Sequence, residues 1–106
     1  MSNLPETYAD DTAKSRRLAT LRVLYENEGS ANESLLRVAL HQLGFRGRHQ
    51  SVEALAGDLK VLLAARLIQE EFYKGKVQTL VITDRGVAFL QRRIEPVPGI
   101  EYPDVA

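Results

Sequence analysis

One change in the spacing of apolar residues, near Leu67, restricts what this 106-residue chain can fold into. Before that point apolar residues recur every three or four positions, which is typical of amphipathic α-helices. After it, residues 67–73 and 77–82 follow a period of two, which is typical of strands. Lys74-Gly75-Lys76 lies between them and predicts a tight hairpin turn. The chain is therefore expected to begin with helices and to continue into a β-hairpin.

Three helices are predicted before the hairpin. The first starts at Asp11, with Asp10 or Asp11 as its cap, and stops at Gly29. The second starts at Ser30 and Glu33, which have the spacing of a capping box, and stops at the glycine in position 44. The third begins near Ser51. The residues expected to form the apolar faces of these helices are Leu18, Leu21, Leu24 and Tyr25; Leu36, Ala39, Leu40 and Leu43; and Val52, Leu55, Leu59, Leu62 and Leu63.

A fourth helix is expected after the hairpin, capped by Thr83 or Asp84 and with Val87, Leu90 and Ile94 on one face. Prolines at positions 96, 98 and 103 break any further regular structure and predict an extended tail. We therefore divide the chain into an N-terminal arm (1–10), one folded domain (11–93) and a C-terminal tail (94–106). The predicted fold class is mainly α with a small β-hairpin, in the order α-α-α-β-β-α.

This order is that of a winged helix, in which the second and third helices form a helix-turn-helix and the hairpin forms the wing. Two segments carry a closer resemblance: residues 59–68, which lead from the third helix into a strand, and residues 80–90, which contain the junction Ile82-Thr83-Asp84-Arg85-Gly86. Together they resemble the MarR and ArsR types of winged-helix transcription regulator over residues 18–93. The chain length and residues 93–103 are also similar to the small winged-helix proteins of Mu-like prophages, which implies a phage-encoded protein.

A helix-turn-helix places the start of its second helix in the major groove of DNA. The corresponding candidate residues are Arg46, Arg48, His49, Gln50, Ser51 and Glu53. Arginine pairs with guanine, glutamine with adenine and glutamate with cytosine, while serine binds phosphate. At the wing, Lys74 and Lys76 suit contacts with the DNA backbone, Tyr73 supports them, and Arg85 is a further phosphate candidate.

A simpler interpretation of these basic residues is that they are solvated charges on exposed turns. The formal net charge of the chain is zero, although residues 30–93 hold ten basic and six acidic side chains. Long-range attraction to DNA is therefore expected to be weak. Glu53 and Asp58 also count against DNA contact, because both are expected on or near the exposed face of the third helix, where a carboxylate repels phosphate.

The sequence favours neither an enzyme nor a cofactor or metal site. It has no cysteine, no nucleotide-binding glycine pattern and no nucleophile motif, and His41 is expected to be a structural or surface residue. No apolar run is long enough to cross a membrane, and the polar, acidic start does not have the pattern of a signal peptide. A cytoplasmic location is therefore expected.

The predicted function is sequence-specific binding of double-stranded DNA by a transcription regulator that acts by occupying its operator. A homodimer is expected, because two-fold symmetry would match a palindromic operator. The alternative is that the same fold serves as a protein–protein adaptor in phage development, which the neutral charge and acidic tail favour. The apolar tail residues Val97, Ile100 and Tyr102 have three possible fates: dimer contacts, packing on their own domain, or ordering by a partner. The operator, the direction of regulation and any small effector stay open.

Overall fold

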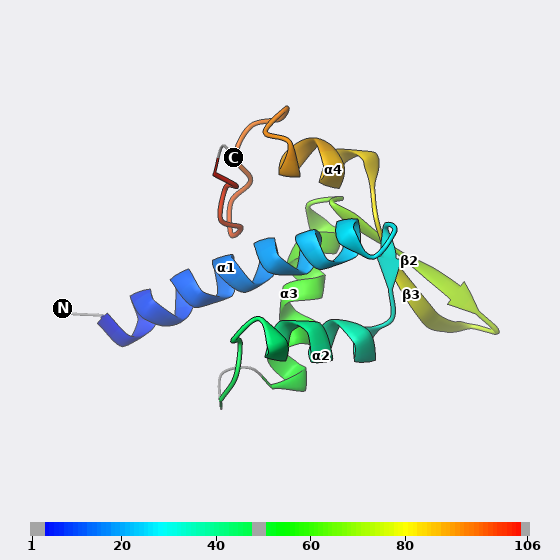
Figure 1. Cartoon of the computed structure of the whole chain (residues 1–106), viewed down its shortest axis with the longest axis horizontal. Helices are drawn as coiled ribbons and strands as arrows, with labels where there is room; N and C mark the ends of the chain where they lie inside the picture. Colours follow the sequence, from blue (N-terminus) through cyan, green and yellow to red (C-terminus); the bar gives the residue numbers. More distant parts are fainter. Residues whose placement is uncertain (1–3, 48–50, 105–106) are drawn as a thin grey trace.

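The computed structural model describes the backbone of residues 4–47 and 51–104, and their side chains from Asp10 onward. Over these residues the chain forms four helices and one three-stranded antiparallel sheet (Figure 1). The elements are α1 (Leu4–Glu26), β1 (Ser30–Ala31), α2 (Glu33–Gln42), α3 (Val52–Ala64), β2 (Ile68–Tyr73), β3 (Lys76–Ile82) and α4 (Asp84–Leu90). The prediction of helices followed by a β-hairpin is confirmed, and so is the further helix after it.

The first helix starts earlier than predicted. It begins at Leu4, so a start at Asp11 with Asp10 or Asp11 as cap was wrong, and most of the expected N-terminal arm is helical. Pro5 is compatible with this start, because the backbone N–H groups of a first helical turn have no acceptor within the helix. A helix of 23 residues therefore forms the longest element of the fold.

The capping box predicted at Ser30 and Glu33 was also wrong, because Ser30 lies in a strand. Ser30 pairs with Val81 and Ala31 with Leu80, and these contacts add β1 to the sheet in the order β1-β3-β2. The N-cap of α2 is instead Asn32, whose side-chain oxygen accepts a hydrogen bond from the backbone N–H of Leu35 at 2.8 Å. The sheet thus has one strand more than the predicted hairpin.

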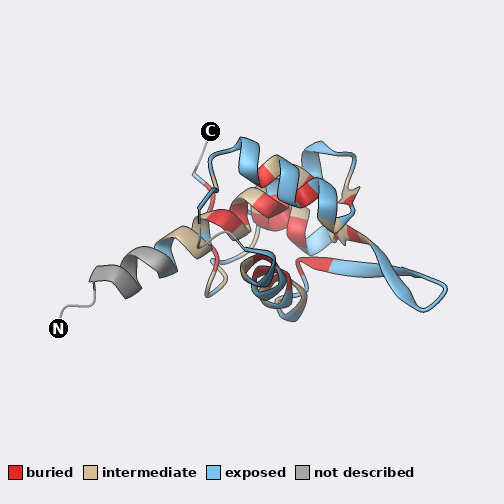
Figure 2. Cartoon of the chain, turned by 90° about the horizontal axis from the view of Figure 1, so that it is seen from below, coloured by how far each residue is buried: buried red, intermediate tan, exposed pale blue. Residues whose placement is uncertain are grey.

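The hairpin has a two-residue turn. Lys74 and Gly75 both have positive φ, 53° and 81°, as a type I′ turn requires. A bulge between Glu71 and Phe72 shifts the register, so that Phe72 pairs with Val77. Residues 72–78 are all exposed, and Figure 2 shows this end of the hairpin projecting beyond the helices. Only the base of the hairpin contributes to the core.

One hydrophobic core joins all the elements except the outer part of the hairpin. Its most deeply buried large side chains are Leu21, Leu24, Leu36, Leu62, Leu67 and Phe89. The predicted apolar faces are largely confirmed, but Tyr25, Leu43 and Val52 are exposed, so their placement in the core was wrong. Ile94, expected on the face of the last helix, lies beyond the end of α4 at Leu90. The core fixes α3 between α1 and the sheet.

Asp58 was predicted to be exposed on α3, but it is buried, with 1% of its surface exposed. Two basic side chains of α1 surround its carboxylate. Arg16, itself buried, binds both carboxylate oxygens, and Arg17 donates from Nε to Oδ1 at 2.9 Å. Burial of this charge is tolerated because it is paired and hydrogen-bonded. The cluster joins α1 to α3 and removes Asp58 from the surface.

The C-terminal tail packs on its own domain, which is one of the three arrangements that the sequence left open. Ile100 and Pro103 are buried, and Arg17 Nη1 donates to the carbonyl oxygen of Gly99 at 2.7 Å. The ring of Tyr102 packs edge-on against Phe89, with 5.6 Å between ring centroids. The tail therefore closes the core on the side of α1 and α4.

Tyr102→Phe is expected to lower the free energy of unfolding by about 1 kcal/mol. The change removes only the hydroxyl, which donates to the carbonyl oxygen of Ile94 at 2.6 Å. Urea unfolding followed by circular dichroism measures the effect. The matched control is Tyr25→Phe, at an exposed tyrosine of α1, for which we expect a change within about 0.5 kcal/mol. Equal effects of the two variants would contradict a structural role for the tail.

Candidate nucleic-acid interface

The candidate interface is built on the turn between α2 and α3. Gly44, with φ of 104°, ends α2, and the backbone N–H of Phe45 donates to the carbonyl oxygen of Leu40 at 3.0 Å. Ser51 caps α3 as predicted, because its hydroxyl oxygen accepts from the backbone N–H of Ala54 at 3.1 Å. Of the predicted groove residues, Arg46, Ser51 and Glu53 lie in the described part and are exposed. The other three, Arg48, His49 and Gln50, lie outside the described residues.

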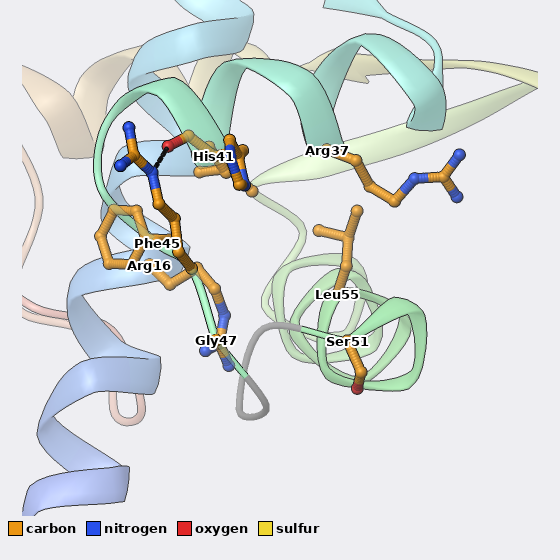
Figure 3. Close-up of a pocket in the computed structure, with 9 residues that line it drawn as sticks. Arg16, Arg37, His41, Phe45, Gly47, Ser51 and Leu55 are labelled. Atoms are coloured by element: carbon orange, nitrogen blue, oxygen red, sulfur yellow. Dashed lines mark hydrogen bonds between the residues drawn. The ribbon is translucent and has the colours of Figure 1, made fainter.

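A hollow of about 360 Å³ lies between α2 and α3 beside this turn (Figure 3). Its floor is apolar, formed by Leu40, Phe45 and Leu55, and Figure 3 shows Leu55 and Ser51 across the hollow from His41 and Phe45. Arginines from α1, α2 and the turn also line it, while none of the described lining residues is acidic. Arg16 is paired with Asp58, and Arg37 lies 3.9 Å from Glu33. The positive charge of the hollow therefore comes mainly from Arg46, and Glu53 adds a negative charge in the first turn of α3.

Arg46 has a local structural contact. Its Nε donates to the carbonyl oxygen of His41, near the end of α2, at 2.9 Å. Cationic side chains are favourable at that end of a helix, where backbone carbonyl groups lack partners. His41 is an exposed residue of α2. The hydrogen bond holds the Arg46 side chain at the end of α2, beside His41, which lies across the hollow from Ser51 (Figure 3).

The outer face of α3 is exposed along its length. Its residues there are Glu53, Ala56, Gly57, Lys60 and Ala64. The small side chains at positions 56 and 57 leave room for a close neighbour, and Lys60 adds a positive charge that the sequence analysis did not single out. The spacing of seven residues from Glu53 to Lys60 was the available signal. Because Asp58 is buried, Glu53 is the one acidic side chain on the exposed face of α3 as described.

The outer end of the hairpin is basic and partly apolar. Lys74 and Lys76 are exposed, and the Lys74 ammonium lies 5.3 Å from the centroid of the Tyr73 ring. Residues 72–78 include no acidic side chain. Phe72 and Val77, which pair across the strands, are also exposed. Three of the predicted wing residues therefore lie together at one end of the molecule.

Arg85, the fourth of the predicted wing residues, does not lie at the outer end of the hairpin. It lies near the start of α4, and its Nε donates to the carbonyl oxygen of Ala65, just after α3, at 2.9 Å. The hydroxyl of Thr83 donates to the neighbouring carbonyl oxygen of Arg66 at 2.7 Å. Both side chains hold the junction between α3 and β2. Arg85 thus has a structural contact in the fold, and its contact with phosphate stays a prediction.

Comparisons with protein-family models, with curated proteins and with solved structures found no match. Among the described side chains, those of residues 10–47 and 51–104, no group of three or more His, Cys, Asp or Glu residues is placed to hold a metal ion. Over the same residues, none of the helices combines the length and the apolar character that crossing a membrane requires. What this chain binds is therefore inferred from the geometry and charge of the α2–α3 turn, the outer face of α3 and the hairpin.

Proposed function

We propose that this chain is a winged-helix protein that binds double-stranded DNA sequence-specifically and regulates transcription by occupying its operator. In this proposal α2 and α3 form the helix-turn-helix, and the hairpin of β2 and β3 is the wing. The main supporting observation is the outer face of α3. It is exposed, it carries small side chains at its centre, and its N-cap Ser51 lines the same hollow as Arg46. Such a face can enter the major groove, which admits one α-helix.

Each part of the interface has its own task in this proposal. Arg46, with Arg48 and Gln50, reads base edges at the start of α3, and Ser51 binds a nearby phosphate. Lys60 contacts the backbone from the same helix. Lys74 and Lys76 hold the DNA backbone through the wing. Regulation then needs no chemical step, because a protein bound at a promoter blocks or recruits polymerase by its presence. The protein acts as a homodimer, since two copies of α3 related by two-fold symmetry match a palindromic site.

Substitutions at the α2–α3 turn and at the wing are expected to change DNA binding in different ways. Arg46→Ala should weaken binding to the preferred duplex by about 1–3 kcal/mol and relax sequence preference, because a base contact is lost. Lys74→Ala with Lys76→Ala should weaken binding to all duplexes alike and reduce the salt slope by about 2, because two phosphate contacts are lost. Fluorescence anisotropy over a salt series measures both effects, after selection of the preferred duplex from random sequences.

The matched control for this experiment is Arg93→Ala. Arg93 is an exposed arginine after α4, away from the proposed interface, and its Nε donates to Gln91 at 2.7 Å. Its removal should leave sequence preference unchanged and the salt slope within experimental error. If all three variants reduced binding to every duplex equally, the assignment of α3 to base reading and of the wing to the backbone would be wrong.

One observation favours a second candidate, a protein–protein adaptor that uses the same fold, for example in phage development. Large apolar side chains are exposed on the hairpin, and Phe72 is 61% exposed. Titration into labelled random-sequence duplex separates the two candidates. A DNA-binding protein should bind at low salt with micromolar or better affinity and lose affinity as salt rises. Absence of binding at low salt would favour the adaptor.

A further inference from the structure

A groove runs between α1 and α2. It shares Phe45 of the α2–α3 turn with the hollow of the proposed DNA interface, but none of the described residues proposed to contact DNA lines it. It consists of two adjoining hollows of about 270 and 340 Å³, which share Val23 and Glu26 of α1 and Leu43 at the end of α2. In Figure 1 the two helices lie side by side, with α2 along the C-terminal half of α1. The groove is thus open over several turns of both helices.

The α2 side of this groove is more apolar than a surface helix requires. Leu36 and Leu40 already bury the inner face of α2 in the core. On the outside, Leu35 is 40% exposed and Leu43 is 59% exposed, and Val38 adds a third large apolar side chain. Scattered single exposed apolar residues are normal, but a cluster beside a groove marks an interaction surface. We therefore expect a partner to cover these exposed apolar side chains.

The charges at the edge of the groove indicate which partner fits. Glu101 of the tail lines this edge as well, and its carboxylate accepts a hydrogen bond from the hydroxyl of Ser15. Arg22 and Glu26 lie one turn apart on α1, and both are exposed. In the described part of the chain neither of them forms an ion pair. If α1 of a second copy lies antiparallel across a two-fold axis, Arg22 of each copy faces Glu26 of the other. The edge is therefore complementary to itself, as an interface between identical subunits requires.

We infer that the groove between α1 and α2 is the dimer interface of this protein, and that its occupant is the same groove of a second copy. Leu43 of each copy packs into the hollows of the other, and the two Arg22–Glu26 pairs close the edge. This inference depends on the homodimer of the proposed function but not on DNA binding. It leaves α3 and the hairpin of both copies free for DNA.

The test measures mass without DNA, by sedimentation equilibrium over a dilution series. The unmodified chain should reach twice the 11.9 kDa of one copy. Leu43→Asp should raise the dimer dissociation constant about 100-fold, because it places a charge in the apolar centre of the interface. Arg22→Glu and Glu26→Arg should each raise it at least about tenfold, because each makes two like-charge pairs across the axis.

Mixing the two charge variants gives the most specific result. Arg22→Glu carries two acidic residues at the edge and Glu26→Arg carries two basic ones, so a heterodimer of the two has two opposite-charge pairs. An equimolar mixture should therefore recover the dissociation constant of the unmodified chain, although neither variant does so alone. Arg93→Glu is the control, because it reverses an exposed charge after α4, outside the groove and the proposed DNA interface, and should leave the dimer unchanged.

The possible results distinguish a failure of this interface from a failure of the homodimer in the proposed function. A monomer at every concentration overturns both the homodimer and the interface. A dimer that is insensitive to Leu43→Asp and to both charge variants overturns the interface alone, provided that circular dichroism shows each variant to be folded. A mixture that stays monomeric overturns the two-fold arrangement of Arg22 and Glu26. None of these results depends on the duplex titration, which tests DNA binding separately.

Discussion

Gly86→Ala is expected to lower the free energy of unfolding by about 3 kcal/mol. A Cβ atom at this position would lie 2.3 Å from the carbonyl oxygen of Leu67 and 2.6 Å from Cγ1 of Ile82. The oxygen cannot easily move away, because it accepts a hydrogen bond from the backbone N–H of Thr83 at 3.0 Å. The added methyl group must therefore push α4 away from the sheet. Urea unfolding followed by circular dichroism measures the loss.

Gly57→Ala is the matched control, and its effect should have the opposite sign. Gly57 is an exposed residue inside α3, and a Cβ there would meet no atom within 4 Å. Alanine is the better helix former, so this variant should be more stable by about 0.5–1 kcal/mol. A similar loss of stability in both variants would mean that the close packing of Gly86 against Leu67 is not what limits that position.

Asp58→Ala is expected to cost about 3–5 kcal/mol, which would make it the largest effect of a single substitution predicted for this chain. Without the carboxylate, the buried guanidinium of Arg16 loses the group that accepts two of its hydrogen bonds and balances its charge at this point of the core. Arg17 loses its Nε acceptor as well. Chemical unfolding gives the number, and Glu53→Ala, which removes an exposed carboxylate from the same helix, should stay within about 0.5 kcal/mol of the unmodified chain.

A double variant tests the cause of that loss. Arg16→Met together with Asp58→Leu replaces the buried ion pair by apolar side chains of similar size. Such replacements are often neutral or stabilising, because neither charge then has to be removed from water. The double variant should therefore recover most of the stability that Asp58→Ala loses. If it were less stable than Asp58→Ala, the broken Arg16–Asp58 pair would not be the reason for the loss.

Local patterns in the sequence predicted the hairpin and the N-caps of α3 and α4 correctly. The turn at Lys74 and Gly75, the N-cap at Ser51 and the N-cap at Thr83 each depend on two to four neighbouring residues, so the spacing alone could indicate them. The junction that ends in Gly86 was noticed only as part of a resemblance. Its physical reason is long-range, because the atoms that exclude a side chain belong to Leu67 and Ile82.

The failed predictions concern residues whose partners are distant in the sequence. Ser30 looked like a helix cap because its pairing with Val81 in the sheet is invisible from the residues beside it. Asp58 looked exposed because it is charged, although its spacing of three from Leu55 and four from Leu62 places it on the apolar face of α3. That spacing was the overlooked signal. At the candidate interface, Lys60 was not predicted, because the helix-turn-helix pattern indicates base contacts only at the first turn of α3.

The contacts of the tail join the two ends of the chain. Arg17 binds the carbonyl oxygen of Gly99, and the backbone N–H of Glu101 donates to the carbonyl oxygen of Lys14 at 3.3 Å. During synthesis on the ribosome, α1 emerges first but gains these partners last. The growing polypeptide can therefore complete its core only after residues 99–101 have left the exit tunnel, and a protein truncated before them would have an incompletely covered first helix.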